Sequence, residues 1–124
     1  MLFMKIGPNI EEWFSRQTHF TRGEDMVGLE ILVRINPDKR AEFLQAFDLL
    51  TELDQQGDRR IDLELFEQVQ EPNTFLWIEH WINDESLTSY YENNKYRALM
   101  GAIEILGQLI HKRSFSIKEE KENA

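Results

Sequence analysis

The 124-residue chain contains no cysteine, so disulfides, thiolate metal sites and cysteine nucleophiles are all excluded. Basic residues are also scarce: 14 Lys and Arg stand against 23 Asp and Glu, which gives a formal net charge of −9. A nucleic-acid-binding protein needs a positive surface against the phosphate backbone, and no basic run of this chain supplies one. We therefore expect no nucleic-acid partner.

Long apolar runs are missing as well, since no stretch approaches the ~18 consecutive apolar residues that a membrane helix needs. The apolar stretch within residues 1–8 is too short for a secretory signal, and its positive charge comes after it. We expect a cytoplasmic protein without a membrane partner. Glycine-rich phosphate loops, nucleotide fingerprints and Gly-x-Ser-x-Gly elbows are absent too, so no flavin, nicotinamide or nucleotide cofactor is expected.

Aromatic residues, in contrast, are plentiful, with three Trp, three Tyr and eight Phe. The length suits one domain, and a hydrophobic fraction of 41% with 30% charged residues is ordinary for a folded soluble protein. Aromatic side chains dominate the energetics of both cores and interfaces. Their number indicates either a well-filled core or a surface that binds a ligand or partner.

Four segments have the apolar alternation of β-strands, which places successive side chains on opposite faces of a sheet. They run over residues 26–35, 60–70, 74–82 and 108–117. Phe66 interrupts the alternation of the second segment, which predicts either a bulge or apolar contacts on both faces. The third segment is apolar on both sides, so we expect it to be a central strand covered twice.

Two segments have the apolar spacing of amphipathic helices, over residues 37–53 and 84–106. Asn36 and Asn83 precede them and are predicted helix caps. Asn93-Asn94 is expected to interrupt the second helix.

The chain divides into an N-terminal arm at 1–25, one domain at 26–117 and a charged, frayed tail at 118–124. The arm is expected to be irregular apart from a short helix at 10–16.

The predicted order is strand-helix-strand, then strand-helix-strand again. Two such units make a ferredoxin-like βαββαβ fold of the α+β class, a four-stranded antiparallel sheet with its helices on one face. The helices cover only that face, while the third strand and part of the second are apolar on both. A bare apolar face is unusual in a monomer, so we expect a homodimer whose sheets pack face to face.

Three short motifs resemble the antibiotic biosynthesis monooxygenase family. They are Val33-Arg-Ile-Asn-Pro37 leading into Glu42-Phe43, Glu79-His-Trp81 and Tyr96-Arg-Ala-Leu99, within a resemblance that spans residues 27–117. The resemblance implies a dimeric α+β barrel. The family includes cofactor-free oxygenases of polycyclic phenols, haem-degrading enzymes and an isomerase of a sugar derivative, and the resemblance therefore implies a small aromatic or quinol-like substrate without a cofactor.

The chain departs from the family at two histidine positions. Tyr90 stands where many members have a histidine, and residues 98–100 are Ala-Leu-Met where haem-degrading members place their iron ligand. No histidine lies between Trp81 and Ile110. Haem ligation in the family's manner is therefore not expected, and haem degradation is the least favoured activity.

Trp77, Glu79 and Trp81 share one face of the predicted third strand. If that face looks toward the helices, the two indoles would bind a flat aromatic ligand, and Tyr90 or Tyr91 would donate a hydrogen bond to it. Simple core packing explains the same residues, and both interpretations stay open here.

His80 or Glu79 is the candidate proton acceptor, although a strand histidine is more often a residue of the dimer interface or a partly exposed structural residue. The three histidines, at 19, 80 and 111, form no i, i+3 or i, i+4 pair, so the sequence indicates no metal site.

The first hypothesis is thus a cofactor-independent monooxygenase with Tyr90, His80 and Glu79 as catalytic residues, and Trp77, Trp81 and Tyr91 as substrate-binding residues. The alternative is a non-catalytic ligand-binding or stress-related homodimer of the same fold, which the absent family histidine favours.

Overall fold

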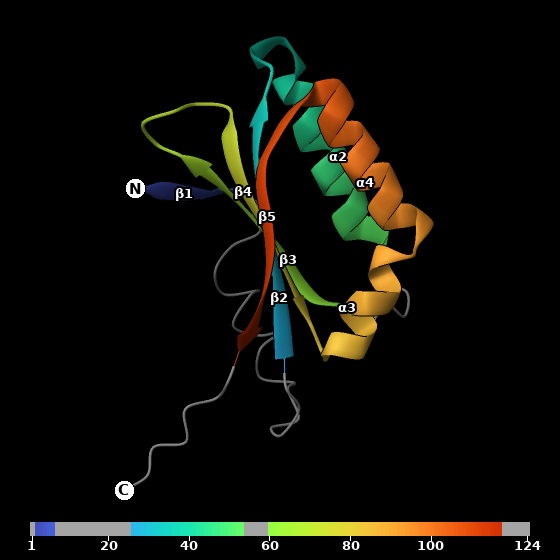
Figure 1. The fold of residues 1–124 in the computed structure, drawn as a ribbon. Helices are drawn as coiled ribbons and strands as arrows, with labels where there is room; N and C mark the ends of the chain where they lie inside the picture. Colours follow the sequence, from blue (N-terminus) through green and yellow to red (C-terminus); the bar gives the residue numbers. More distant parts are fainter. Residues whose placement is uncertain (1, 7–25, 54–59, 118–124) are drawn as a thin grey trace, which may run out of the picture.

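The computed structural model describes residues 2–6, 26–53 and 60–117 (Figure 1). The predicted helix at 10–16 and the tail at 118–124 lie outside the described residues. Within the described ranges, no helix is long and apolar enough to cross a bilayer.

Strands and helices alternate as the two-unit pattern predicts, with one additional strand at the start. The strands are β1 (Phe3–Ile6), β2 (Met26–Ile35), β3 (Arg60–Gln68), β4 (Thr74–Trp81) and β5 (Gly107–Ile117). The helical segments are the 3-10 turn η1 (Pro37–Lys39) and the helices α2 (Arg40–Leu53), α3 (Asp84–Tyr91) and α4 (Asn94–Leu106).

The strands form one antiparallel sheet in the order β1-β3-β4-β2-β5, and all three α-helices lie on one face of it (Figure 1). This confirms the ferredoxin-like α+β fold. The predicted number of four strands was wrong, because residues 3–6 of the expected irregular arm pair with β3, from Phe3 opposite Gln68 to Ile6 opposite Leu65. Four residues are too few to show a reliable alternation, but their backbone satisfies the open edge of β3.

The hydrophobic core lies between the sheet and the helices. Alternate residues of β2 point into it, and Leu29, Ile31 and Val33 are all 0% exposed. Phe47 of α2 packs edge-on against Trp77 of β4, with ring centroids 5.2 Å apart. Phe66 of β3 pairs in regular register with Leu76 of β4, so there is no bulge at this position. Its departure from alternation reflects an apolar side chain on the sheet face that points away from the helices.

The asparagines at the helix starts differ in what they do. The side chain of Asn83 accepts a hydrogen bond from the backbone N–H of Ser86 at 2.8 Å, which confirms it as the cap of α3. Asn93 caps α4 in the same way through Lys95 N–H at 2.9 Å, and this explains the predicted break. The predicted side-chain cap at Asn36 was wrong: Asn36 makes no side-chain capping bond, and the chain enters a 3-10 turn there.

A bidentate ion pair joins the start of α2 to the end of β3, beside the β3–β4 turn. Arg40 Nη2 donates to Glu67 Oε1 at 2.7 Å, and Arg40 Nη1 contacts the other carboxylate oxygen and Asn73 Oδ1. Asn73, whose φ of 70° is left-handed, donates its backbone N–H to Glu67 Oε2 at 2.8 Å. The hydrogen bond from Arg40, together with that from Asn73, lowers the pKa of Glu67 below its ordinary value.

This pair predicts an acid-sensitive contribution to stability. A lowered folded-state pKa stabilises the protein above the ordinary value of 4.5, and the contribution disappears as the pH falls through the lowered value. Glu67→Gln should therefore reduce the free energy of unfolding by about 2 kcal/mol at pH 7 and by much less near pH 3, measured by urea denaturation.

Glu71→Gln is the matched control, because Glu71 pairs with Arg34 where both side chains are 57% exposed. Its effect should stay below about 1 kcal/mol. An equal loss for Glu67→Gln at both pH values would contradict the assignment.

Candidate functional site

Trp77, Glu79 and Trp81 all point from β4 toward the helices, as alternation predicts. Their exposed fractions are 2%, 0% and 4%, so the three side chains lie inside the core. Glu79 Oε2 accepts hydrogen bonds from Trp77 Nε1 at 3.0 Å and from the hydroxyl of Tyr90 at 3.2 Å. A buried carboxylate needs such donors, and these two connect β4 to α3.

A chain of four aromatic rings leads from this carboxylate toward the surface. Trp81 lies against Tyr90 with ring centroids 4.5 Å apart, Tyr90 lies 5.3 Å from Tyr96, and Tyr96 lies 5.0 Å from Tyr91. The Nε1 atom of Trp81 is buried and has no hydrogen-bond partner among the described residues. Offset and edge-on contacts of this kind stabilise aromatic clusters beyond simple burial.

The outer end of the chain opens into a hollow of about 460 Å³ between the α3–α4 junction and β5. It is lined by Tyr91, Tyr96, Lys112, Arg113 and Ser114. Lys112 Nζ lies 5.5 Å from the ring centroid of Tyr91 and 5.0 Å from that of Tyr96, whose hydroxyl it also contacts. Two aromatic walls beside the cationic Lys112 suit a small aromatic anion, whereas the Arg113 guanidinium pairs with Glu30 on the other face of the sheet.

The hydroxyl of Tyr91 is kept protonated by its surroundings. Burial raises the pKa of Tyr91 most, and the neighbouring Tyr96 and the acidic Glu79 and Asp84 add to the increase. A hydrogen bond with Ser114 offsets part of it. Tyr91 is therefore a neutral hydrogen-bond donor at the hollow near pH 7.

The predicted site residues fall into three places. Tyr91 lines the hollow, whereas Trp77, Glu79, Trp81 and Tyr90 form the buried network behind it. The remaining residue, His80, lies on the opposite face of the sheet.

Four residues of the hollow were not predicted: Tyr96, Lys112, Arg113 and Ser114. Tyr96 was named within the Tyr96-Arg-Ala-Leu99 motif of the family resemblance, and its ring is buried. The other three belong to β5, whose register against β2 shifts between Leu32 and Val33. Counting along the sequence therefore could not place Lys112 beside the tyrosines.

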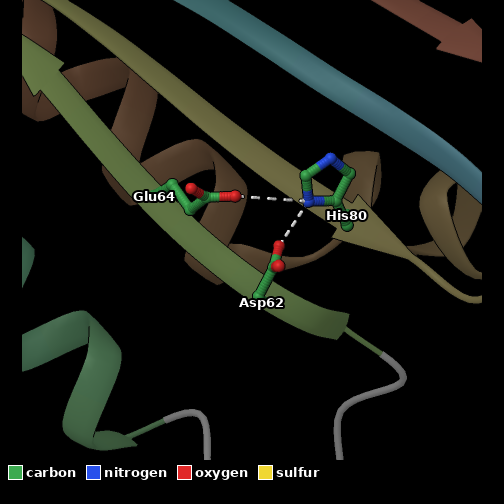
Figure 2. A group of neighbouring side chains, drawn as sticks. All are labelled: Asp62, Glu64 and His80. Carbon is green, nitrogen blue, oxygen red and sulfur yellow. Dashed lines mark hydrogen bonds and ion pairs between the residues drawn. The ribbon is translucent and has the colours of Figure 1, made fainter. Parts of the chain in front are cut away.

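On the opposite face, His80 meets two carboxylates of β3 (Figure 2). Its Nδ1 atom hydrogen-bonds with Asp62 Oδ1 and lies 3.9 Å from Glu64 Oε1. Burial by itself lowers the pKa of His80. The hydrogen bond and charge of Asp62 and the charge of Glu64 raise this pKa by more than burial lowers it, so the net change is upward. His80 pairs directly with Asp62 across the two strands. Counting residues outward along β3 and β4 from the turn that joins them would have placed Asp62 opposite His80, and this was the signal for the cluster.

The cluster predicts an elevated and Asp62-dependent titration of His80. Its pKa, followed by the NMR chemical shifts of the imidazole protons, should exceed the ordinary value of 6.5 in the wild type. Asp62→Asn removes the acceptor charge and should lower it, because the imidazolium loses its principal partner. Asp38→Asn, on the distant turn η1, is the control and should leave it unchanged. A His80 pKa that ignores Asp62→Asn would be inconsistent with this geometry.

Comparisons with known proteins identify a family and agree with the fold. The family described as antibiotic biosynthesis monooxygenase matches residues 26–102. The chain is 27% identical over 75 residues to the protein named "Putative monooxygenase YcnE" of Bacillus subtilis (strain 168), which covers 60% of this chain and 79% of that protein.

Among solved structures, a conserved protein of unknown function from Bacteroides thetaiotaomicron VPI-5482 superimposes with a TM-score of 0.65 at 23% identity, covering 77% of this chain and 100% of that one. A protein of Caulobacter crescentus CB15, named as a "putative antibiotic biosynthesis monooxygenase", gives 0.63 at 16% identity, covering 79% and 92%. These two likenesses concern the fold. On the match over residues 26–102, the chain belongs to the antibiotic biosynthesis monooxygenase family.

Proposed function

We propose that this protein is a cofactor-independent monooxygenase of a small aromatic or quinol-like metabolite, which binds at the hollow beside Tyr91 and Tyr96. Family membership supports the reaction class. The observation that carries the assignment to this place is Lys112 Nζ, which lies within 5.5 Å of both tyrosine ring centroids. A phenol stacked there meets a fixed positive charge, and that charge favours its phenolate form.

The phenolate is the species that reacts with oxygen. An electron-rich phenolate can reduce O2 directly, so the substrate itself supplies the electrons. For an anthrone-type substrate the balance is simple: the methylene carbon loses two hydrogens and gains one oxygen atom as a ketone, and the second oxygen atom leaves as water. The protein has only to bind the ring, favour its deprotonation and exclude water.

The buried network supplies the remaining roles. Tyr90 and Glu79 lie behind the hollow, so their proposed role is to position its tyrosine wall: Tyr90 donates to Glu79 Oε2 and its ring contacts Tyr96. Trp77 and Trp81 fix this pair, the first through its hydrogen bond to Glu79 and the second through ring contact with Tyr90. His80 faces away from the hollow and takes no part in the proposed step.

Lys112→Gln tests the proposal through oxygen consumption with a panel of anthrone- and quinol-type substrates. Loss of the ammonium should lower kcat/KM by at least about tenfold, equivalent to about 1.4 kcal/mol, and should move the pH profile toward alkaline values as the substrate phenol becomes harder to ionise. Lys39→Gln, which removes an exposed cation from η1, is the matched control and should retain wild-type rates.

The same panel separates the alternatives. Quenching of tryptophan fluorescence without product would select the non-catalytic ligand-binding dimer, and no turnover above background with any substrate would remove the enzyme assignment. A Soret band on haem titration would instead favour haem degradation.

We further propose that the second sheet face pairs with another copy of this chain, which gives a homodimeric α+β barrel. Apolar side chains gather there from neighbouring strands: Leu32, Phe66, Leu76, Ile78 and Phe115, each half-buried. None of the described helices covers this face (Figure 1). Two sheets packed about 10 Å apart would bury these side chains.

Ile78→Lys should disrupt this pairing, because it places a charge in the middle of the apolar face. Light scattering after size exclusion should give a dimer for the wild type and a monomer for Ile78→Lys at micromolar concentration. Ile105→Lys, on α4 where Ile105 is 76% exposed, makes the same chemical change on the helical side and should leave the dimer intact. A wild-type monomer would refute the pairing.

A further inference from the structure

Asp62, Glu64 and His80 form a compact group outside the hollow and its aromatic network. One ligand atom from each residue lies within 4.8 Å of the others, on the sheet face that the helices leave uncovered (Figure 2). We propose that this group is a binding site for a first-row divalent transition-metal ion such as Zn²⁺, Mn²⁺ or Co²⁺. The inference does not depend on the proposed oxygenase activity, because the hollow lies on the other side of the sheet.

The donor set determines which ions fit. One imidazole nitrogen and two carboxylate oxygens suit borderline ions, whereas Mg²⁺ and Ca²⁺ favour shells made of oxygen alone. Three protein ligands also leave at least one coordination position for water or a substrate atom, as in catalytic metal sites.

The three ligands sit on the paired strands β3 and β4 and not on loops. Asp62 and His80 are direct cross-strand partners, and Glu64 is the diagonal neighbour of His80. Asp62 is only 6% exposed, which restricts its rotamers. Rigid strands of this kind hold ligands more accurately than loops do.

The surroundings also orient the imidazole. Phe115 meets His80 edge-on, with ring centroids 6.4 Å apart. The Phe115 ring occupies the space above Gly28, where an added Cβ would lie 2.2 Å from it. A glycine at this position therefore allows the aromatic ring to reach His80, and the contact fixes the ring plane with Nδ1 directed at the carboxylates.

Glu64 can keep its ion pair with Lys5 while its other oxygen faces His80. Lys5 Nζ lies 3.5 Å from Glu64 Oε2, whereas the oxygen that faces His80 is Oε1. The ammonium thus fixes the carboxylate from outside the site, as outer partners of metal ligands do.

Only small side-chain movements are needed to admit the ion. Ligand atoms about 2.0–2.2 Å from a common ion lie roughly 3–3.5 Å from one another. The 3.9 Å separation between His80 Nδ1 and Glu64 Oε1 has to shorten slightly, and the hydrogen bond between His80 and Asp62 has to open.

Calorimetric titration of the EDTA-treated full-length protein with Zn²⁺, Mn²⁺ and Co²⁺ tests the proposal. We expect one ion per chain, and the visible d–d spectrum of bound Co²⁺ should report a nitrogen–oxygen shell. Mg²⁺ and Ca²⁺ should not compete at similar concentrations. His80→Gln, Glu64→Gln and Asp62→Asn should each weaken binding by at least about tenfold, as loss of a ligand does.

His111→Gln is the matched control, since His111 is a half-exposed histidine that pairs with a single carboxylate, Glu30. It should bind the ion as the wild type does. The thermal midpoint gives a readout separate from folding defects: Zn²⁺ should raise it in the wild type and in His111→Gln, but not in a folded His80→Gln.

Three results would each overturn the metal site: no stoichiometric binding of any of the three ions, binding that survives His80→Gln and Glu64→Gln, or binding lost with His111→Gln. The first would leave the group as an ion pair of His80 with two carboxylates, and the last would assign the ion to the protein surface.

Discussion

Side-chain alternation on β4 is the constraint on which both candidate sites depend. β4 is bordered by β3 on one side and by β2 on the other, so its direction and pleat are fixed by two ladders of hydrogen bonds. Glu79 must then point toward the helices and His80 away from them, although they are neighbours in sequence. The sheet thereby separates two polar groups with different chemistry, and no single ligand can reach both.

Glu79 is the costlier of the two residues to accommodate, because it is a fully buried carboxylate. Its partners come from different elements: Trp77 lies two residues earlier on the same strand face, and Tyr90 lies on α3. Satisfying the carboxylate therefore sets the position of α3 on the sheet. The aromatic chain through Tyr96 to Tyr91 follows from that position, so the hollow at its end is a consequence of how one buried carboxyl group is bonded.

The fold was predictable because its information is local. Apolar periodicity predicted the strand and helix order, Asn83 marked a real cap, and the interruption expected at Asn93-Asn94 coincides with the cap of α4. The site was less predictable, since it depends on register. β1 is too short to show a pattern, the bulge in the β2–β5 pairing hid the position of Lys112, and the carboxylates near His80 join it only across a hairpin. Residue spacing along the chain, the usual signal for metal ligands, cannot detect a cross-strand group.

The second sheet face combines two requirements that affect each other. Its apolar side chains favour removal from water by a second copy, but Asp62 and Glu64 lie among them as negative charges. Transfer of two carboxylates into a dry interface is unfavourable unless positive charge accompanies them. Protonated His80 with Lys5 provides that charge, and so does a divalent ion held by the same three ligands. Whatever occupies this group therefore changes the free energy of pairing, and by thermodynamic reciprocity pairing changes the affinity for the occupant by the same factor.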